Sequence, residues 1–163
     1  MSMNKSHISL IMQKSVNSFT GSNLSIRGST TKGVDSIPAF SGKAGKYEPI
    51  PPGDYWIQTD EIFEIGVTTD LSTKLAAIAL GKSGSFFESC IKHMQAWGSY
   101  RIPIRQLASQ EKATGRNAMF IHGGEVYGSA GCIDLQHWMD WFVKFLLDEH
   151  QGKEPQRIIL HVR

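Results

Sequence analysis

Residues 120–134 read FIHGGEVYGSAGCID, and they place a histidine and a cysteine close together with glycines and a serine between them. His122 ends an apolar run that is typical of a buried strand, and two glycines follow it as a turn signal. Cys132 comes ten residues later, directly after another glycine. Beyond Asp134, apolar residues recur at helical spacing as far as residue 147, which predicts a long helix with Asp134 as its N-cap.

This pattern gives the cysteine the surroundings that a nucleophilic thiol needs. A cysteine attacks as the thiolate, and a nearby imidazole or a helix N-terminus lowers its pKa from the ordinary value of roughly 8.5. His122 supplies the imidazole, and the predicted helix start lies beside Cys132. Backbone N–H groups of Gly131 and Cys132 could form an oxyanion hole. The alternative is a buried structural cysteine and a hydrogen-bonded structural histidine, but the combination of residues favours catalysis.

The order of these residues resembles that of the L,D-transpeptidase catalytic domain. The family pattern is HG, a spacer, and S-x-G-C followed by a branched residue, and this chain has His122-Gly123 and then SAGCI at 129–133. The short spacer is similar to that of the effector branch, the Tlde type VI secretion effectors that attack peptidoglycan stem peptides. Residues 36–42 (SIPAFSG) and 50–57 (IPPGDYWI) are similar to a further stretch of these effectors.

The resemblance implies a fold and a set of site residues. The fold is α+β and mainly β, an L,D-transpeptidase-like β-sandwich with one long helix after the catalytic cysteine. Cys132 is the acylated nucleophile, His122 is the general base, and the pocket is shaped by Gly123, Ser129 and Gly131.

Two positions depart from the family pattern. Ala130 stands where many transpeptidases carry a histidine, which leaves His122 as the base. Asp134 stands where the family usually has an arginine or asparagine, and an acidic group there would not favour a substrate carboxylate.

Other residues are candidates for binding the substrate. A stem peptide carries carboxylates, which guanidinium groups bind bidentately. Arg101 and Arg105 lie in a predicted extended stretch, Arg116 shortly precedes the predicted strand, and Tyr127 lies between base and nucleophile. For each arginine, a solvated surface charge is the alternative.

The function that the resemblance implies is that of an L,D-carboxypeptidase or L,D-transpeptidase. The thiol attacks a carbonyl of a tetrapeptide stem and releases the terminal D-amino acid, and water or a free D-amino acid then resolves the thioester. No cofactor is needed. The expected partner is a peptidoglycan stem peptide, and a toxin of this kind implies a cognate immunity protein and a secretion apparatus. The alternatives are a catalytically silent cell-wall or protein-binding module on the same scaffold, and a cysteine hydrolase of another amide.

Length and composition predict one domain over residues 1–163, with 40% hydrophobic and 20% charged residues. A net charge of +2 without a Lys/Arg cluster does not support a nucleic-acid or membrane-surface partner. No apolar run is long enough to span a membrane, and the N-terminal apolar stretch is too short for a signal peptide. A wall-acting enzyme without a signal peptide must leave the cell by a dedicated secretion route or by lysis, so we expect synthesis in the cytoplasm, release by one of these routes, and action in the periplasm of target cells.

Weaker patterns complete the set of expectations. A zinc site of His122, Cys132 and His137 has no recognised ligand spacing, so no metal is expected. The GKS at 81–83 lacks the upstream glycine of a phosphate loop. Strands are predicted at 7–12, 23–27, 54–58 and 157–162, extended backbone at 99–107, and an amphipathic helix containing Cys90 at 86–97, while 61–66 and 71–80 are ambiguous.

Overall fold

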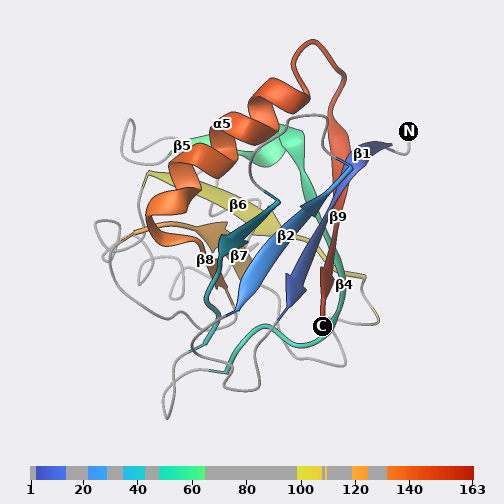
Figure 1. The fold of residues 1–163 in the computed structure, drawn as a ribbon. Coiled ribbons are helices and arrows are strands. Elements are labelled where there is room, and N and C mark those ends of the chain that lie inside the picture. The colour runs from blue at the N-terminus through green and yellow to red at the C-terminus, as the bar shows by residue number, and fades with distance from the viewer. Residues whose placement is uncertain are drawn as a thin grey trace, which may run out of the picture.

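The computed structural model describes residues 3–13, 22–28, 35–42, 48–64, 99–107, 109, 119–124 and 132–163. Within them, two mixed sheets and one α-helix make an α+β, mainly β fold, which confirms the predicted class (Figure 1). The first sheet has the strand order β3-β2-β1-β9-β4, and the second has the order β5-β6-β7-β8.

The strands of the first sheet are β1 (Asn4–Gln13), β2 (Asn23–Arg27), β3 (Ser36–Pro38), β4 (Gly53–Gln58) and β9 (Gln156–Val162). Those of the second are β5 (Phe63–Glu64), β6 (Tyr100–Ile104), β7 (Met119–His122) and β8 (Ile133–Asp134). Two short 3₁₀ helices, η1 (Thr59–Glu61) and η2 (Gln136–Trp138), and the α-helix α5 (Met139–Glu149) complete the described elements.

The first sheet forms because its strands bury every second side chain. On β1, Ile8, Leu10 and Met12 are buried, while the residues between them are exposed or half-buried. The central pair β1 and β9 is parallel, and the other pairs of this sheet are antiparallel. The predicted strands at 7–12, 23–27, 54–58 and 157–162 are confirmed, each within three residues at either end.

The two central strands of the second sheet are buried along most of their length: all four residues of β7 and four of the five residues of β6 are buried. Strand β7 pairs antiparallel with β6 and parallel with β8. Two isolated bridges connect this sheet to the chain of the first: Trp56 pairs with Arg105, and Phe40 pairs with Asp134. The predicted extended stretch at 99–107 contains β6 and is confirmed.

The helix after the cysteine exists, but it begins later than the sequence predicted. Asp134 belongs to β8, and α5 starts at Met139 with Trp138 as an N-cap that makes no side-chain hydrogen bond. The expectation that Asp134 caps this helix was wrong, because Gln136 has a φ of +50°, a left-handed backbone that interrupts an α-helix. Asp134 instead accepts the N–H of Gln136 through Oδ1 at 2.8 Å and stabilises the turn before η2.

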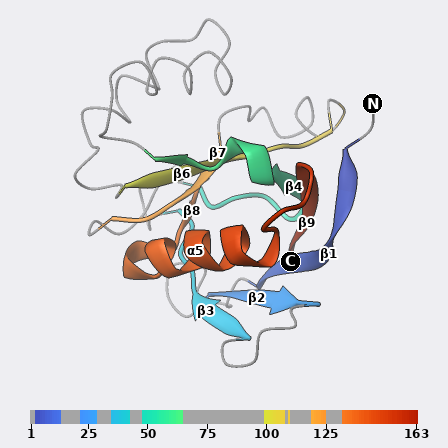
Figure 2. The same ribbon diagram turned by 90° about the horizontal axis from the view of Figure 1, so that it is seen from above.

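The helix buries residues such as Phe142 and Leu146 in the main core, and Trp138 and Trp141 pack against that core while partly buried. Seen from above, α5 has β6, β7 and β8 on one side and β2 and β3 on the other (Figure 2). Core residues of both sheets therefore meet around this helix.

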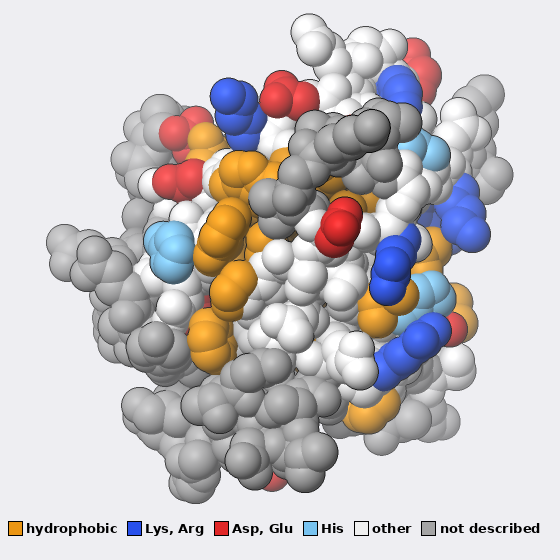
Figure 3. All heavy atoms as spheres, viewed as in Figure 1, with side chains coloured by type: hydrophobic (Ala, Val, Ile, Leu, Met, Phe, Trp, Pro, Cys, Tyr) orange, Lys and Arg blue, Asp and Glu red, His pale blue; other side chains and the backbone are white. Residues whose placement is uncertain are grey.

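The surface carries charges of both signs. On the face drawn in Figure 3, acidic and basic side chains both occur, beside a band of hydrophobic side chains. Among the described large hydrophobic residues, Leu107 and Leu147 are the most exposed, at 60% and 52%. Of the helices that the structure describes, none is long and apolar enough to span a membrane.

Three sequence expectations lie outside the described residues: the helix with Cys90 at 86–97, the ambiguous segment 71–80 and the GKS at 81–83. In the ambiguous segment 61–66, the described part contains the end of η1 and the short strand β5.

Candidate functional site

Three ionisable side chains form a row across the second sheet. Arg101 on β6 is the register partner of His122 on β7, and His122 is the register partner of Asp134 on β8. Paired residues on neighbouring strands point to the same face of a sheet, so the three side chains share one face. All three are buried, with 2%, 1% and 0% of their surfaces exposed.

That face is opposite to the one that builds the main core. The main core contains Ile102, Met119, Ile121 and Ile133, which alternate along their strands with the residues of the row. Phe120 and Cys132 are also buried but are not members of this core. Cys132 directly precedes β8 and has the same parity as Asp134, so the alternation of β8, if continued by one residue, puts it on the face of His122.

The tautomer of His122 is set by the backbone carbonyl of the next residue, Gly123. Its Nδ1 lies 2.8 Å from the carbonyl oxygen of Gly123, and because a carbonyl only accepts, Nδ1 carries the proton. In the neutral ring, Nε2 is then the basic nitrogen. Burial lowers the pKa of His122 to about 3; the Arg101 charge contributes to this lowering, while the bond to Gly123 opposes it. His122 is therefore neutral at neutral pH.

Cys132 is a thiol rather than half of a disulfide, and 0% of its surface is exposed. The prediction that it lies at a helix N-terminus was wrong, because β8 and η2 separate it from α5. Three of the N–H groups that follow it are already bonded: that of Asp134 to Phe40, that of Leu135 to His122, and that of Gln136 to Asp134. The dipole of α5 is thus not available to stabilise a thiolate here.

Among the described residues, Asp134 is an acid that lies close to His122. Its Oδ1 lies 3.9 Å from Nδ1 of His122, and its Oδ2 is buried without a hydrogen-bond partner among the described residues. Burial raises the pKa of Asp134 to about 7, and the bond from the N–H of Gln136 partly offsets this rise. Its charge therefore changes in the neutral pH range.

Gly123 has a packing reason to be glycine. A Cβ built on it would lie 2.7 Å from the carbonyl oxygen of Gln136 and 2.7 Å from Cβ of Met139. The end of β7 thus touches the start of α5 closely enough to exclude a side chain. The carbonyl that holds His122 is fixed by the same contact.

The two described arginine candidates differ in their surroundings. Arg101 lies beside His122 in the row, and its Nη1 is 3.5 Å from the carbonyl oxygen of Tyr100. Arg105 is paired with Glu61 through two hydrogen bonds, Nε to Oε2 at 3.1 Å and Nη2 to Oε1. Its backbone also forms the bridge to Trp56, so the structure gives Arg105 a role in joining the two sheets.

The remaining candidates, Arg116, Tyr127, Ser129 and Gly131, lie outside the described residues, as does Ala130. The proximity of Asp134 to His122 was missed in the sequence. A sequence signal for this proximity is that His122 and Asp134 each directly follow an isoleucine of a short apolar segment. Those isoleucines, Ile121 and Ile133, are register partners in the structure. His137 is the middle residue of η2, and no group of three metal-ligating side chains occurs within the described residues.

Comparisons with known proteins bear on the fold. No protein-family model matches the chain, and no curated protein matches it. Its fold is similar to that of Bdellovibrio bacteriovorus Bd1075, with a TM-score of 0.52 and 17% sequence identity over 94% of this chain. The likeness covers 48% of the Bd1075 chain, so the present chain spans about half of that structure. At this identity the similarity concerns the fold alone.

Proposed function

We propose that this protein is a cysteine-dependent enzyme of peptidoglycan stem peptides, an L,D-carboxypeptidase or an L,D-transpeptidase that exchanges D-amino acids. Cys132 is the nucleophile and His122 is the base. We also propose that the fold is of the L,D-transpeptidase type, a β-sandwich with α5 following the cysteine.

The observation that carries this proposal is the placement of the two residues. His122 ends β7, and Cys132 directly precedes β8, the strand that pairs in parallel with β7; the strand alternation continued back to Cys132 supports a position on the face of His122. Gly123 fixes the imidazole in the tautomer whose Nε2 is basic, which is the form that a general base requires. The resemblance of the sequence to the transpeptidase pattern, with HG before S-x-G-C, supports the same assignment.

The mechanism follows from these roles. Nε2 of His122 takes the thiol proton of Cys132 while Sγ forms a bond to the stem-peptide carbonyl carbon. The tetrahedral intermediate collapses when its C–N bond breaks, and the proton on His122 moves to the departing amine of the terminal D-amino acid. Water hydrolyses the resulting thioester to a carboxylate, whereas attack by a free D-amino acid produces an exchanged stem.

Arg101 is the described cation best placed to hold a substrate carboxylate. It is the register partner of His122 and lies on the same face, and its charge contributes to the lowered pKa of His122. A guanidinium group binds a carboxylate with two parallel hydrogen bonds. In this proposal Arg101 takes the place of the arginine that the family usually carries at the position of Asp134.

The resemblance to type VI secretion effectors supports an antibacterial role. In that role the protein acts on the stem peptides in the periplasm of a target cell. The producing cell then needs a cognate immunity protein and a secretion apparatus.

The test is mass spectrometry of disaccharide-tetrapeptide incubated with the wild type, Cys132→Ala and His122→Gln, with and without a free D-amino acid. Loss or exchange of the terminal residue with the wild type alone supports the proposal and identifies the acceptor. Intact muropeptide with the wild type would contradict it. Arg101→Lys keeps the charge but loses the bidentate geometry, so we expect it to raise KM more than it lowers kcat.

A catalytically silent binding module on the same scaffold is the second candidate, favoured by the complete burial of Cys132. Substrate attack requires the surroundings of this thiol to open, whereas a structural cysteine requires no such motion. Alkylation of the folded protein with iodoacetamide separates the two candidates, because a structural thiol reacts only on unfolding.

A further inference from the structure

Asp134 is the feature of this site that the proposed mechanism does not yet use. It is fully buried on the strand next to His122, in register with it, and its Oδ1 is 3.9 Å from Nδ1 of that histidine. A carboxyl group buried beside an imidazole can balance the positive charge that the imidazole acquires on taking a proton.

We propose that Asp134 is a positioning and charge-balancing residue for His122, so that the reactive set is Cys132, His122 and Asp134. The role rests on the proposed function, since it applies when the thiol proton moves from Sγ to Nε2 and His122 becomes cationic. Nδ1 keeps its own proton throughout and faces two acceptors, the carbonyl of Gly123 and Oδ1 of Asp134.

The two carboxylate oxygens of Asp134 have different surroundings. Oδ1 accepts the N–H of Gln136 at 2.8 Å, which holds the carboxyl in place against the turn. Oδ2 is buried and has no hydrogen-bond partner among the described residues, so the ionised form is poorly solvated there. An imidazolium cation next to it would supply the missing compensation.

The positive charge of Arg101 makes a negative charge on Asp134 more important for stabilising a protonated His122. Arg101 lies on the opposite neighbouring strand and its charge disfavours the imidazolium. Arg101 and Asp134 thus flank His122 with opposite effects, and Cys132 supplies the proton from the same face. When Asp134 is ionised, the thiolate–imidazolium pair gains stability, and when it is neutral, that gain is lost.

The protonation of Asp134 determines how the reactivity of Cys132 changes with pH. Because the pKa of Asp134 is raised to about 7 by burial, its carboxyl is neutral in mildly acidic solution and ionised above neutrality. The reactivity of Cys132 should therefore increase with pH through about 7, in addition to any increase from the thiol itself.

Asp134→Asn isolates the charge, because the asparagine oxygen can still accept the N–H of Gln136. The matched control is Asp54→Asn, which removes the acid of an exposed pair in which Asp54 Oδ1 lies 2.7 Å from Nδ1 of His161 on the first sheet. The readout is the rate of Cys132 alkylation by iodoacetamide between pH 5 and 9, followed by intact-protein mass spectrometry.

We expect the wild type and Asp54→Asn to show an inflection near pH 7. Asp134→Asn should lose the inflection and react about tenfold to a hundredfold more slowly at pH 8, which is less than the whole effect of a general base. An Asp134→Asn profile equal to that of the wild type would overturn the proposal, and so would a wild-type thiol that is inert at every pH.

Two further measurements keep the inference distinct from the proposed function and from misfolding. If the wild type leaves muropeptides intact but shows the inflection that depends on Asp134, the proposed stem-peptide substrate is contradicted and the proposed role of Asp134 is supported. If Asp134→Asn does not fold, the ¹³Cγ resonance of Asp134 in the wild type must titrate with the same midpoint as the alkylation rate. Midpoints that differ by more than about one pH unit would overturn the proposal.

Discussion

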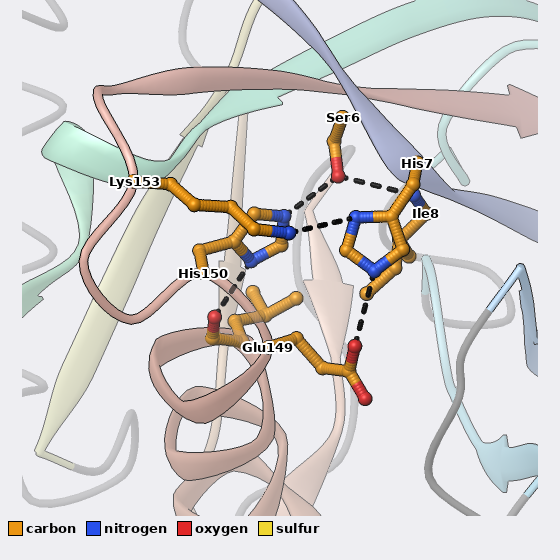
Figure 4. A network of polar contacts seen from close by, with 7 residues as sticks. Ser6, His7, Ile8, Glu149, His150 and Lys153 are labelled. Atoms are coloured by element: carbon orange, nitrogen blue, oxygen red, sulfur yellow. Dashed lines mark hydrogen bonds and ion pairs between the residues drawn. The ribbon is translucent and has the colours of Figure 1, made fainter.

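Ser6 on β1 and His150 at the end of α5 are joined by a hydrogen bond of 2.6 Å between Oγ and Nε2, although 144 residues separate them in the chain. Nδ1 of His150 donates to the carbonyl of Leu146 at 2.7 Å, so Nε2 accepts the hydroxyl proton of Ser6. Oγ in turn accepts the N–H of Ile8, at the place where the β1–β9 register shifts (Figure 4). The bond thus fastens the end of α5 to an irregular part of the central strand pair.

Ser6→Ala should destabilise the fold by about 1–3 kcal/mol, because it leaves buried polar atoms of His150 and Ile8 without the serine oxygen. Urea unfolding measures the change. Ser36→Ala is the matched control, since Ser36 is exposed at the start of β3, and we expect a change within about 0.5 kcal/mol. Equal losses in the two variants would contradict a structural role for the Ser6–His150 bond.

His122 and Asp134 should make opposing contributions to stability as the pH changes. Burial lowers the pKa of His122 to about 3, so below its ordinary value near 6.5 the unfolded chain binds the proton first and stability falls with falling pH. Burial raises the pKa of Asp134 to about 7 from 3.8, so over this interval the folded chain holds the extra proton and stability falls with rising pH. Between about pH 4 and 6.5 the two effects largely cancel.

Single substitutions should expose each effect. Asp134→Asn leaves the His122 contribution, so the free energy of unfolding should fall by about 1.4 kcal/mol more per pH unit on acidification than in the wild type. His122→Gln leaves the Asp134 contribution, and its difference from the wild type should have the opposite sign. Burial also lowers the pKa of His150, but this contribution is common to all three proteins and drops out of the differences. Urea titrations at each pH measure the stability of the three proteins. Parallel curves of stability against pH would refute the opposing contributions of His122 and Asp134.

Much of the fold could be predicted because its strands have a regular pattern. Ile8, Leu10 and Met12, and again Ile158, Leu160 and Val162, are buried at every second position, and in the sequence they stand in short, mostly apolar runs that are typical of strands. The pairing of β1 with β9 could not be predicted in this way, since it joins the two ends of the chain and depends on tertiary packing.

Local signals failed where tertiary contacts override them. Asp134 followed by apolar residues at helical spacing reads as a helix start, yet its backbone pairs with both His122 and Phe40. The left-handed turn at Gln136 then postpones the helix to Met139, and a single sequence carries no sign of a positive φ at glutamine. In the candidate site, His122 and Cys132 could be proposed from their spacing, whereas the proximity of Asp134 to His122 became evident from the strand register.

Arg105 should contribute to stability and not to turnover, in contrast to Arg101. Its guanidinium forms a bidentate pair with Glu61, which has only 8% of its surface exposed. Arg105→Lys loses the fork geometry and leaves Glu61 partly compensated, so we expect a loss of about 1–2 kcal/mol in urea unfolding with kcat and KM close to those of the wild type. A raised KM for stem peptide with unchanged stability would instead assign Arg105 to substrate binding.

Alanine substitutions at Gly123 and Gly152 should be destabilising for different reasons, steric crowding at Gly123 and backbone strain at Gly152. Gly123→Ala places a methyl group against Gln136 and Met139, whose nearest atoms would be 2.7 Å away, so the end of β7 must move from α5 at a cost of about 1–3 kcal/mol. Gly152→Ala meets no atom within 4 Å, but its φ of +72° is left-handed and costs about 1 kcal/mol.

The two alanine variants should lower the melting temperature for different reasons, and only Gly123→Ala should also disturb the chemistry. The displaced carbonyl of residue 123 no longer holds Nδ1 of His122 in place, so we expect Cys132 alkylation at pH 8 to slow in this variant, while Gly152→Ala reacts like the wild type. Differential scanning calorimetry and the alkylation assay on the same samples measure both quantities. If Gly123→Ala loses stability but reacts at the wild-type rate, the carbonyl of Gly123 does not orient His122. In that case the carbonyl would have been displaced without any effect on the reactivity of Cys132.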